Sequence, residues 1–170
     1  MKGDEQVIDA LNHALRSEVT AILQYFLHAE MCSDWGYSKL AAFVKKSSID
    51  EMLHAEKLIE RILFLEGHPT MSPMAPVNVG RNVPEQFAND LALEHEAVKV
   101  YNGYVKLCAE KADNVSRDLF QQLVTDEERH VDFLETQLSM IEQLGLPNYL
   151  VLQSAPAGAA SAADAGGGGA

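Results

Sequence analysis

The sequence contains little cysteine and no long apolar run, and both absences exclude classes of protein. Its two cysteines, Cys32 and Cys108, form no Cys-x-x-Cys pair, which excludes a zinc ribbon or a rubredoxin-type site. We expect two reduced thiols, as in cytoplasmic proteins. No stretch approaches the roughly 18 consecutive apolar residues of a membrane span. The charged first residues are followed by no apolar stretch, so we expect neither a secretory signal nor a membrane partner.

Positive charge is also scarce. Lys and Arg number 13 against 25 Asp and Glu, which leaves a formal net charge of −12. A nucleic-acid surface requires the opposite sign, so we expect no nucleic-acid partner. An acidic field instead concentrates cations. The 47 % of apolar residues is enough for one domain with a buried core.

Four long segments carry apolar residues every third or fourth position, which is typical of amphipathic helices. They run roughly over 4–32, 38–66, 83–111 and 114–144. The first and third connections are short, whereas 67–82 is long and contains three prolines. A long connection fits a crossover along the whole bundle, which would make the second and third helices parallel. The sequence therefore predicts an all-α four-helix bundle.

The chain ends in two segments of different character. Residues 146–152 are apolar enough to form a short fifth helix, whereas 153–170 consist almost entirely of Ala, Gly, Ser and Pro. That composition buries too little apolar surface to fold, so we expect a flexible tail. We therefore expect one domain over 1–152 and an Ala/Gly-rich appendage over 153–170.

The most informative feature is a repeat of polar residues on the apolar faces. A Glu-x-x-His motif lies on the second and on the fourth helix, and a single glutamate interrupts the face of each other helix. Each of these residues in the first half of the chain has a counterpart of the same type 76 positions later. The pairs are Glu18 and Glu94, Glu51 and Glu127, and His54 and His130. The chain thus resembles two related helical hairpins in tandem.

This spacing has a chemical reason. Residues three apart lie on one helix face, so Glu and His at that spacing can bind one metal ion together. Two such motifs and two further glutamates supply four carboxylates and two imidazoles, a ligand set known from di-iron and di-manganese bundles. Such oxygen-rich ligands suit iron or manganese. One motif alone is more often an exposed surface pair, but the complete set predicts a di-metal site.

These motifs resemble the bacterioferritin family. The similar stretches are 24–28, 48–56, 59–67, 90–94 and 126–130, and the resemblance extends over about 1–152. It implies a ferritin-like four-helix bundle with a long crossover between helices two and three and a short C-terminal fifth helix. It also implies a cytoplasmic iron store assembled from 24 subunits in two-fold dimers around a mineral cavity.

The resemblance assigns roles to the polar repeat. Glu51 and Glu127 would bridge two iron ions, Glu18 and His54 would complete one position, and Glu94 and His130 the other. The pair would act as a ferroxidase, oxidising Fe(II) with dioxygen or hydrogen peroxide.

The family also implies haem b, shared between two subunits, with one methionine from each as axial ligand. The matching residue is Met52. It is adjacent to Glu51 and therefore points about 100° around the helix from the metal face. A two-fold interface presents the same residue twice, which suits this ligation. A ferredoxin-type reductant is a further partner that the resemblance implies.

Two residues beside the motifs are accessory candidates. Several bacterioferritins carry a histidine where this chain has Lys46, and that histidine supports an inner-surface iron together with Asp50. A protonated lysine has no lone pair to donate, so this extra site is in question here. Tyr25 lies near the ligands and either loses an electron during turnover or serves as a core tyrosine.

Other functions remain open from the residues alone. One is a di-iron oxidoreductase or peroxidase that keeps its metals as a fixed cofactor, and another is a haem-binding cage subunit without oxidation chemistry. A DNA-protecting mini-ferritin is disfavoured because one chain supplies all six ligands. The remaining histidines show no partner pattern, so we expect surface or packing roles for His13, His28, His68 and His95.

Overall fold

The computed structural model describes residues 1–154, and this part of the chain is entirely helical outside its connections. The helices are α1 (Glu5–Asp34), α2 (Ser38–Phe64), α3 (Val83–Glu110), α4 (Asn114–Leu144) and α5 (Leu146–Gln153). This confirms the expected all-α bundle with a short fifth helix. The expected tail over 153–170 lies outside the described residues, except for Gln153, which ends α5, and Ser154.

The ends of the helices follow local chemistry. The carboxylate of Asp4 accepts from the backbone N–H of Gln6 at the start of α1, and Asn82 accepts from that of Glu85 at the start of α3. α2 ends two residues earlier than expected because Glu66 adopts a left-handed φ of 62°. That conformation reverses the chain and is a common helix terminator.

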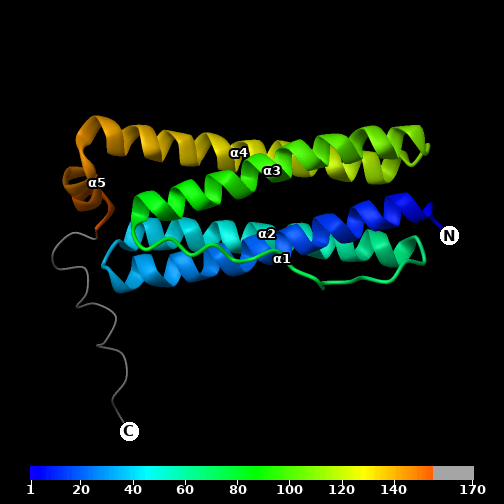
Figure 1. Cartoon of the computed structure of the whole chain (residues 1–170), viewed down its shortest axis with the longest axis horizontal. Coiled ribbons are helices and arrows are strands. Elements are labelled where there is room, and N and C mark those ends of the chain that lie inside the picture. The colour runs from blue at the N-terminus through cyan, green and yellow to red at the C-terminus, as the bar shows by residue number, and fades with distance from the viewer. Residues whose placement is uncertain (155–170) are drawn as a thin grey trace, which may run out of the picture.

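The connectivity is the expected one (Figure 1). α1 packs mainly against α2, and α3 mainly against α4. The crossover 65–82 runs along the α1–α2 pair from one end of the bundle to the other, so α2 and α3 point the same way. The crossover is held to α1 by side chains. Asn12 bonds the backbone of His68 and Thr70, and farther along α1 Gln24 accepts from the N–H of Asn78.

Apolar packing fills the bundle on both sides of a polar middle. One cluster contains Leu11, Leu58, Ile62, Phe120 and Leu123. Another, at the opposite end, contains Leu40, Phe87, Leu134 and Tyr149. α5 closes that end, because Tyr149 is fully buried and its hydroxyl donates to Gln137 at 2.8 Å. The buried glutamates therefore lie in the middle of the bundle, far from its ends.

No helix among the described residues is both long and apolar enough to span a bilayer.

Candidate metal centre

The six residues of the polar repeat converge on one place. α1 supplies Glu18, α2 supplies Glu51 and His54, α3 supplies Glu94, and α4 supplies Glu127 and His130. The four glutamates are only 1–2 % exposed and His54 is 4 % exposed. The donor atoms form two overlapping groups, within each of which all atoms lie within 4.8 Å of one another. The two hairpins thus bring together residues that are up to 112 positions apart.

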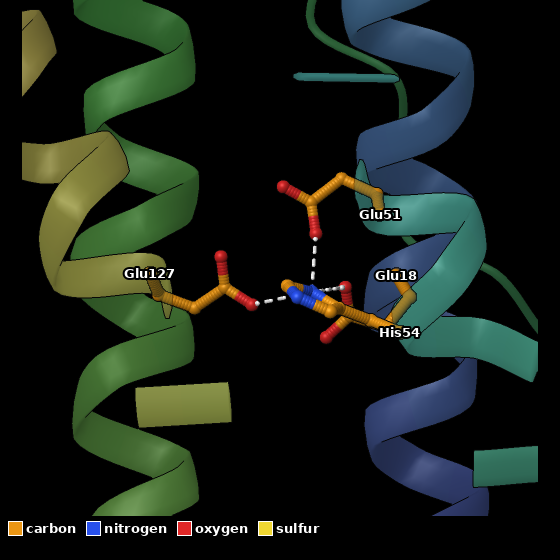
Figure 2. A group of neighbouring side chains, drawn as sticks. All are labelled: Glu18, Glu51, His54 and Glu127. Atoms are coloured by element: carbon orange, nitrogen blue, oxygen red, sulfur yellow. Dashed lines mark hydrogen bonds and ion pairs between the residues drawn. The ribbon is translucent and has the colours of Figure 1, made fainter. Parts of the chain in front are cut away.

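The first group is centred on His54 (Figure 2). Its Nδ1 lies 3.4 Å from Glu18, 3.0 Å from Glu51 and 3.1 Å from Glu127. In the view of Figure 2 the imidazole extends from α2 toward α4, with carboxylates on three sides. This group can provide one metal position.

The second group is centred on His130. Its Nδ1 lies 2.9 Å from Glu51, 3.4 Å from Glu94 and 3.1 Å from Glu127. Glu51 and Glu127 belong to both groups, whereas each other residue belongs to one. The arrangement is therefore two positions that share two carboxylates.

Several donor atoms at this place lack a hydrogen-bond partner within residues 1–154. They are one oxygen of Glu51, both oxygens of Glu127 and Nδ1 of His130, all buried. Buried polar atoms are rarely left without partners, because each costs about 1–3 kcal/mol. Carboxylate oxygens and a ring nitrogen directed into one space are the arrangement that a cation requires. The donor set therefore fits a pair of divalent metal ions, whose charge four carboxylates would balance.

The carboxyl groups respond strongly to this crowding. Burial raises the pKa of Glu18, and the negative charge of Glu51 raises it further. Burial and the charge of Glu51 likewise raise the pKa of Glu94 to about 8. For Glu51 burial acts in the same direction, but the close imidazoles of His130 and His54 outweigh it and lower its pKa below the usual range. The carboxyls thus divide into two that favour a proton and one that stays ionised.

The imidazoles carry the compensating charge. Burial by itself would lower the pKa of His54, but contacts with Glu127, Glu18 and Glu51 raise it to about 12. The pKa of His130 is also raised well above its usual range, since three carboxylates surround it. Without a metal ion both rings hold protons, which metal binding must displace.

Two tyrosines contact the centre. The hydroxyl of Tyr25 donates to Glu94, and that of Tyr101 donates to Glu18. Tyr25 was expected near the ligands, but the role of Tyr101 was not foreseen. The sequence did contain a signal, because Tyr101 follows Tyr25 by the same 76 positions that relate the ligands.

A buried polar network next to the centre was also missed. Asp90, one turn before Glu94, accepts from the amide of Gln24 at 2.8 Å and lies 3.0 Å from Nδ1 of His28. Nε2 of His28 accepts from the N–H of Gly80 at 3.0 Å. His28 is therefore a packing histidine, as expected, and it fastens the crossover beside α3.

A cavity of about 410 Å³ reaches both histidines from the outside of the bundle between α2 and α4. Two ion pairs line it, Lys46 with Asp50 and Arg129 with Asp126. Asp50 thus lies in the cavity wall, where its charge is neutralised by Lys46, and not in the centre.

Met52 lies elsewhere, as expected from its position on the helix. It is 52 % exposed on the outer side of α2. Large apolar side chains of α1 are exposed beside it. The two helices are joined at this level, because the hydroxyl of Ser48 on α2 donates to the carbonyl of Ile22 on α1. This apolar patch consists of Leu23, Phe26, Leu27, Ile49 and Met52.

Known proteins are similar to this chain over most of its length. The family model of the ferritin-like domain matches residues 8–144. The bacterioferritin of Rhodobacter capsulatus is 50 % identical over 160 residues, which cover 94 % of this chain and 99 % of that protein. This chain belongs to the bacterioferritin family. The Brucella melitensis bacterioferritin is 45 % identical over 92 % of this chain and 98 % of its own length.

Solved bacterioferritins have the same fold. The R. capsulatus structure superposes with a TM-score of 0.91 over 94 % of this chain and 99 % of that one, and it is described with a metal-free dinuclear site and a haem iron in a crystallographic special position. The Mycobacterium tuberculosis bacterioferritin BfrA, 41 % identical, superposes with a TM-score of 0.90 over 91 % of this chain and 98 % of that one. Membership in this family and the buried carboxylate–histidine group establish iron storage as the function of the chain.

Proposed function

We propose that this bacterioferritin is a ferroxidase, which oxidises Fe(II) to Fe(III) for storage with dioxygen or hydrogen peroxide as the electron acceptor. The observation that carries the proposal is the buried set of four carboxylates and two imidazoles with partnerless donor atoms. Two Fe(II) supply two electrons, which reduce dioxygen to hydrogen peroxide or hydrogen peroxide to water. No other group of three or more His, Cys, Asp or Glu side chains within residues 1–154 shares this geometry.

The overlap of the two groups supports the division of ligands expected from the family. Glu51 and Glu127 would bridge the two iron substrates, because each lies in both groups. Glu18 with His54 would hold one, and Glu94 with His130 the other. Nδ1 is the donor of each ring, since that nitrogen faces the carboxylates.

The route to the centre supports a substrate rather than a permanently enclosed cofactor. The cavity between α2 and α4 is lined by both histidines and opens to the surface. The rings therefore form the boundary between the centre and the cavity, so Fe(II) can enter and Fe(III) can leave beside them.

The assembly belongs to the same proposal. Relatives of this family form multi-subunit iron stores, and we propose 24 subunits built from two-fold dimers around a mineral cavity. The apolar patch supports a dimer through the α1–α2 face, because five large apolar side chains exposed together are costly in water. The buried cysteines are free thiols, which supports the expected cytoplasmic location.

Haem b would bind at this dimer interface, with Met52 of each subunit as axial ligand. The thioether is exposed within an apolar patch, as an apolar macrocycle requires. An atom in a special position lies on a symmetry element, so the haem iron of the R. capsulatus protein is consistent with a group shared by two subunits. When bound, haem would supply one-electron chemistry, for which a ferredoxin-type protein is the proposed reductant.

Substitution of Met52 by Leu tests this ligation. We expect loss of the haem absorbance with an unchanged assembly, because leucine retains the apolar contact but has no sulfur. Haem absorbance that persists in the variant would place the axial ligand elsewhere.

The second candidate function is a di-iron peroxidase that keeps its metals. Aerobic addition of Fe(II) to the purified metal-free protein, followed by absorbance and size-exclusion chromatography, separates the two. Rapid oxidation far beyond two Fe(II) per chain, in a particle much larger than a monomer, is the expected result. Oxidation that stops at two per chain would instead indicate a fixed cofactor, and peroxide reduction would then be measured.

A further inference from the structure

The two tyrosines of the centre are related in the same way as its ligands. Tyr101 on α3 donates across the bundle to Glu18 on α1, and Tyr25 on α1 donates across it to Glu94 on α3. Each tyrosine follows the glutamate of its own helix by seven residues, which is two helical turns. The internal two-fold that relates the ligands thus also relates the hydroxyls that hold two of them.

We propose that Tyr101 is a positioning residue of the centre, which orients Glu18 for metal binding at the Glu18–His54 position. This inference rests on the proposed ferroxidase function. Tyr101 is fully buried, and its hydroxyl has no partner other than Glu18 within residues 1–154. The hydroxyl therefore serves the carboxylate and not the packing of the core.

The two oxygens of Glu18 have separate tasks. Oε1 accepts from Tyr101, whereas Oε2 faces Nδ1 of His54 at 3.4 Å. A glutamate side chain has several rotatable bonds, and holding one oxygen keeps the other directed at the metal position. Without the hydroxyl, the carboxylate would have to be ordered again each time a metal ion binds.

The Glu94 side differs in one respect. The same oxygen, Oε1, accepts from Tyr25 and faces Nδ1 of His130 at 3.4 Å. There the tyrosine competes with a metal ion for one oxygen. The two hydroxyls therefore have unequal consequences, and the loss of Tyr101 should weaken metal binding more than the loss of Tyr25.

The aromatic surroundings allow the hydroxyl to be tested by itself. The ring of Tyr101 packs against Phe120 with centroids 5.9 Å apart, and Tyr104 packs against the same Phe120 at 5.1 Å. Tyr101→Phe keeps this packing and removes only the hydroxyl. Tyr104→Phe is the matched control, because its ring lies in the same cluster and makes no hydrogen bond to a candidate ligand.

Cobalt(II) is the probe, since its d–d absorption reports both stoichiometry and ligand geometry without iron oxidation. We expect the full-length wild-type protein to bind two Co(II) per chain. In Tyr101→Phe one of the two should bind roughly tenfold more weakly, the effect of one hydrogen bond to a charged group, with a changed d–d spectrum. Tyr104→Phe should match the wild type, and Tyr25→Phe should show the smaller change.

A double variant separates positioning from packing. If Tyr101 acts through Glu18, adding Tyr101→Phe to Glu18→Ala should weaken Co(II) binding no further. Additive losses, or a Tyr101→Phe titration identical to the wild type, would overturn the proposal. A wild-type protein that binds no Co(II) would overturn the proposed function itself, so the two failures are distinguishable.

Discussion

At the scale of the residue, the centre combines acidic groups whose proton affinities differ. Burial and mutual repulsion raise the pKa of Glu18 and Glu94, whereas Glu51 stays ionised beside the two protonated rings. In the metal-free protein, the protons on these carboxyl groups and imidazoles supply the positive charge that metal ions would otherwise supply. Binding of a divalent cation must therefore release them, which couples metal affinity to pH.

This coupling has a definite sign. The pKa of His54 is raised to about 12 and that of Glu94 to about 8, so both groups hold protons at pH 7 in the metal-free protein. Raising the pH from 6 to 8 should strengthen Co(II) binding, roughly tenfold per pH unit for each proton released. Titrations at several pH values in weak buffer with a pH indicator measure both quantities. Affinity that is independent of pH would contradict the protonated metal-free state.

The buried hydrogen-bond network around Asp90 should contribute to the stability of the fold. Asp90→Ala leaves His28 and the amide of Gln24 buried without their common acceptor. We expect the free energy of unfolding to fall by about 2–3 kcal/mol, the cost of unsatisfied buried groups. Denaturant unfolding of the metal-free protein measures it. Glu96→Ala on the same helix is the control, because Glu96 is exposed and, within residues 1–154, pairs with Lys99 alone. An equal loss in both variants would argue against the network.

At the scale of the element, the start of α4 is joined to α2. Asp113 accepts from the backbone N–H of Ser116 and pairs with Arg61 at 2.6 Å. The hydrogen bonds and the positive charge of Arg61 lower the pKa of Asp113 even though burial opposes this. One side chain thus caps a helix and links the two hairpins close to one end of the bundle.

Replacing Asp113 by Ala removes the cap and the ion pair together. A cap is worth about 1 kcal/mol and a partly buried pair adds to it, so we expect a loss of about 2 kcal/mol. Thermal unfolding measures the change. Asp118→Ala is the control on the same helix, since Asp118 is exposed and its ion pair in the described part of the chain is with its neighbour Arg117. If both variants unfold at the same temperature as the wild type, Asp113 does not stabilise the bundle as a cap and ion-pair partner.

At the scale of the whole molecule, the outer face of α1 and α2 exposes several large apolar side chains to water. Phe26 is 44 % exposed and Met52 52 % exposed. Phe26→Glu replaces an apolar side chain of the proposed dimer interface by a carboxylate, which assembly would have to remove from water even if Lys45 pairs with it. We expect a shift from the large assembly to smaller species in size-exclusion chromatography, together with loss of haem. Phe26→Leu should assemble normally; a normal assembly of Phe26→Glu would place the interface elsewhere.

The sequence by itself determined the helices, the crossover and the six residues of the centre. Apolar periodicity sets helix faces locally, and the 76-residue offset revealed the centre because an internal repeat copies ligands together with their spacing. Two helix ends were misplaced by two residues each: α1 continues to Asp34 instead of ending at 32, and α2 ends at Phe64 instead of 66. The early end of α2 came from Glu66, whose left-handed conformation no glycine announced.

Only the tertiary structure decided which groups meet across the bundle. Tyr101 and Glu18 are 83 positions apart, and His28, Asp90 and Gly80 lie on three different segments. A buried tyrosine or histidine occupies the same kind of position on a helix face whether its polar atom contacts a metal ligand or an ordinary packing neighbour. The distinction depends on the relative rotation and translation of packed helices, which no periodicity along one chain contains.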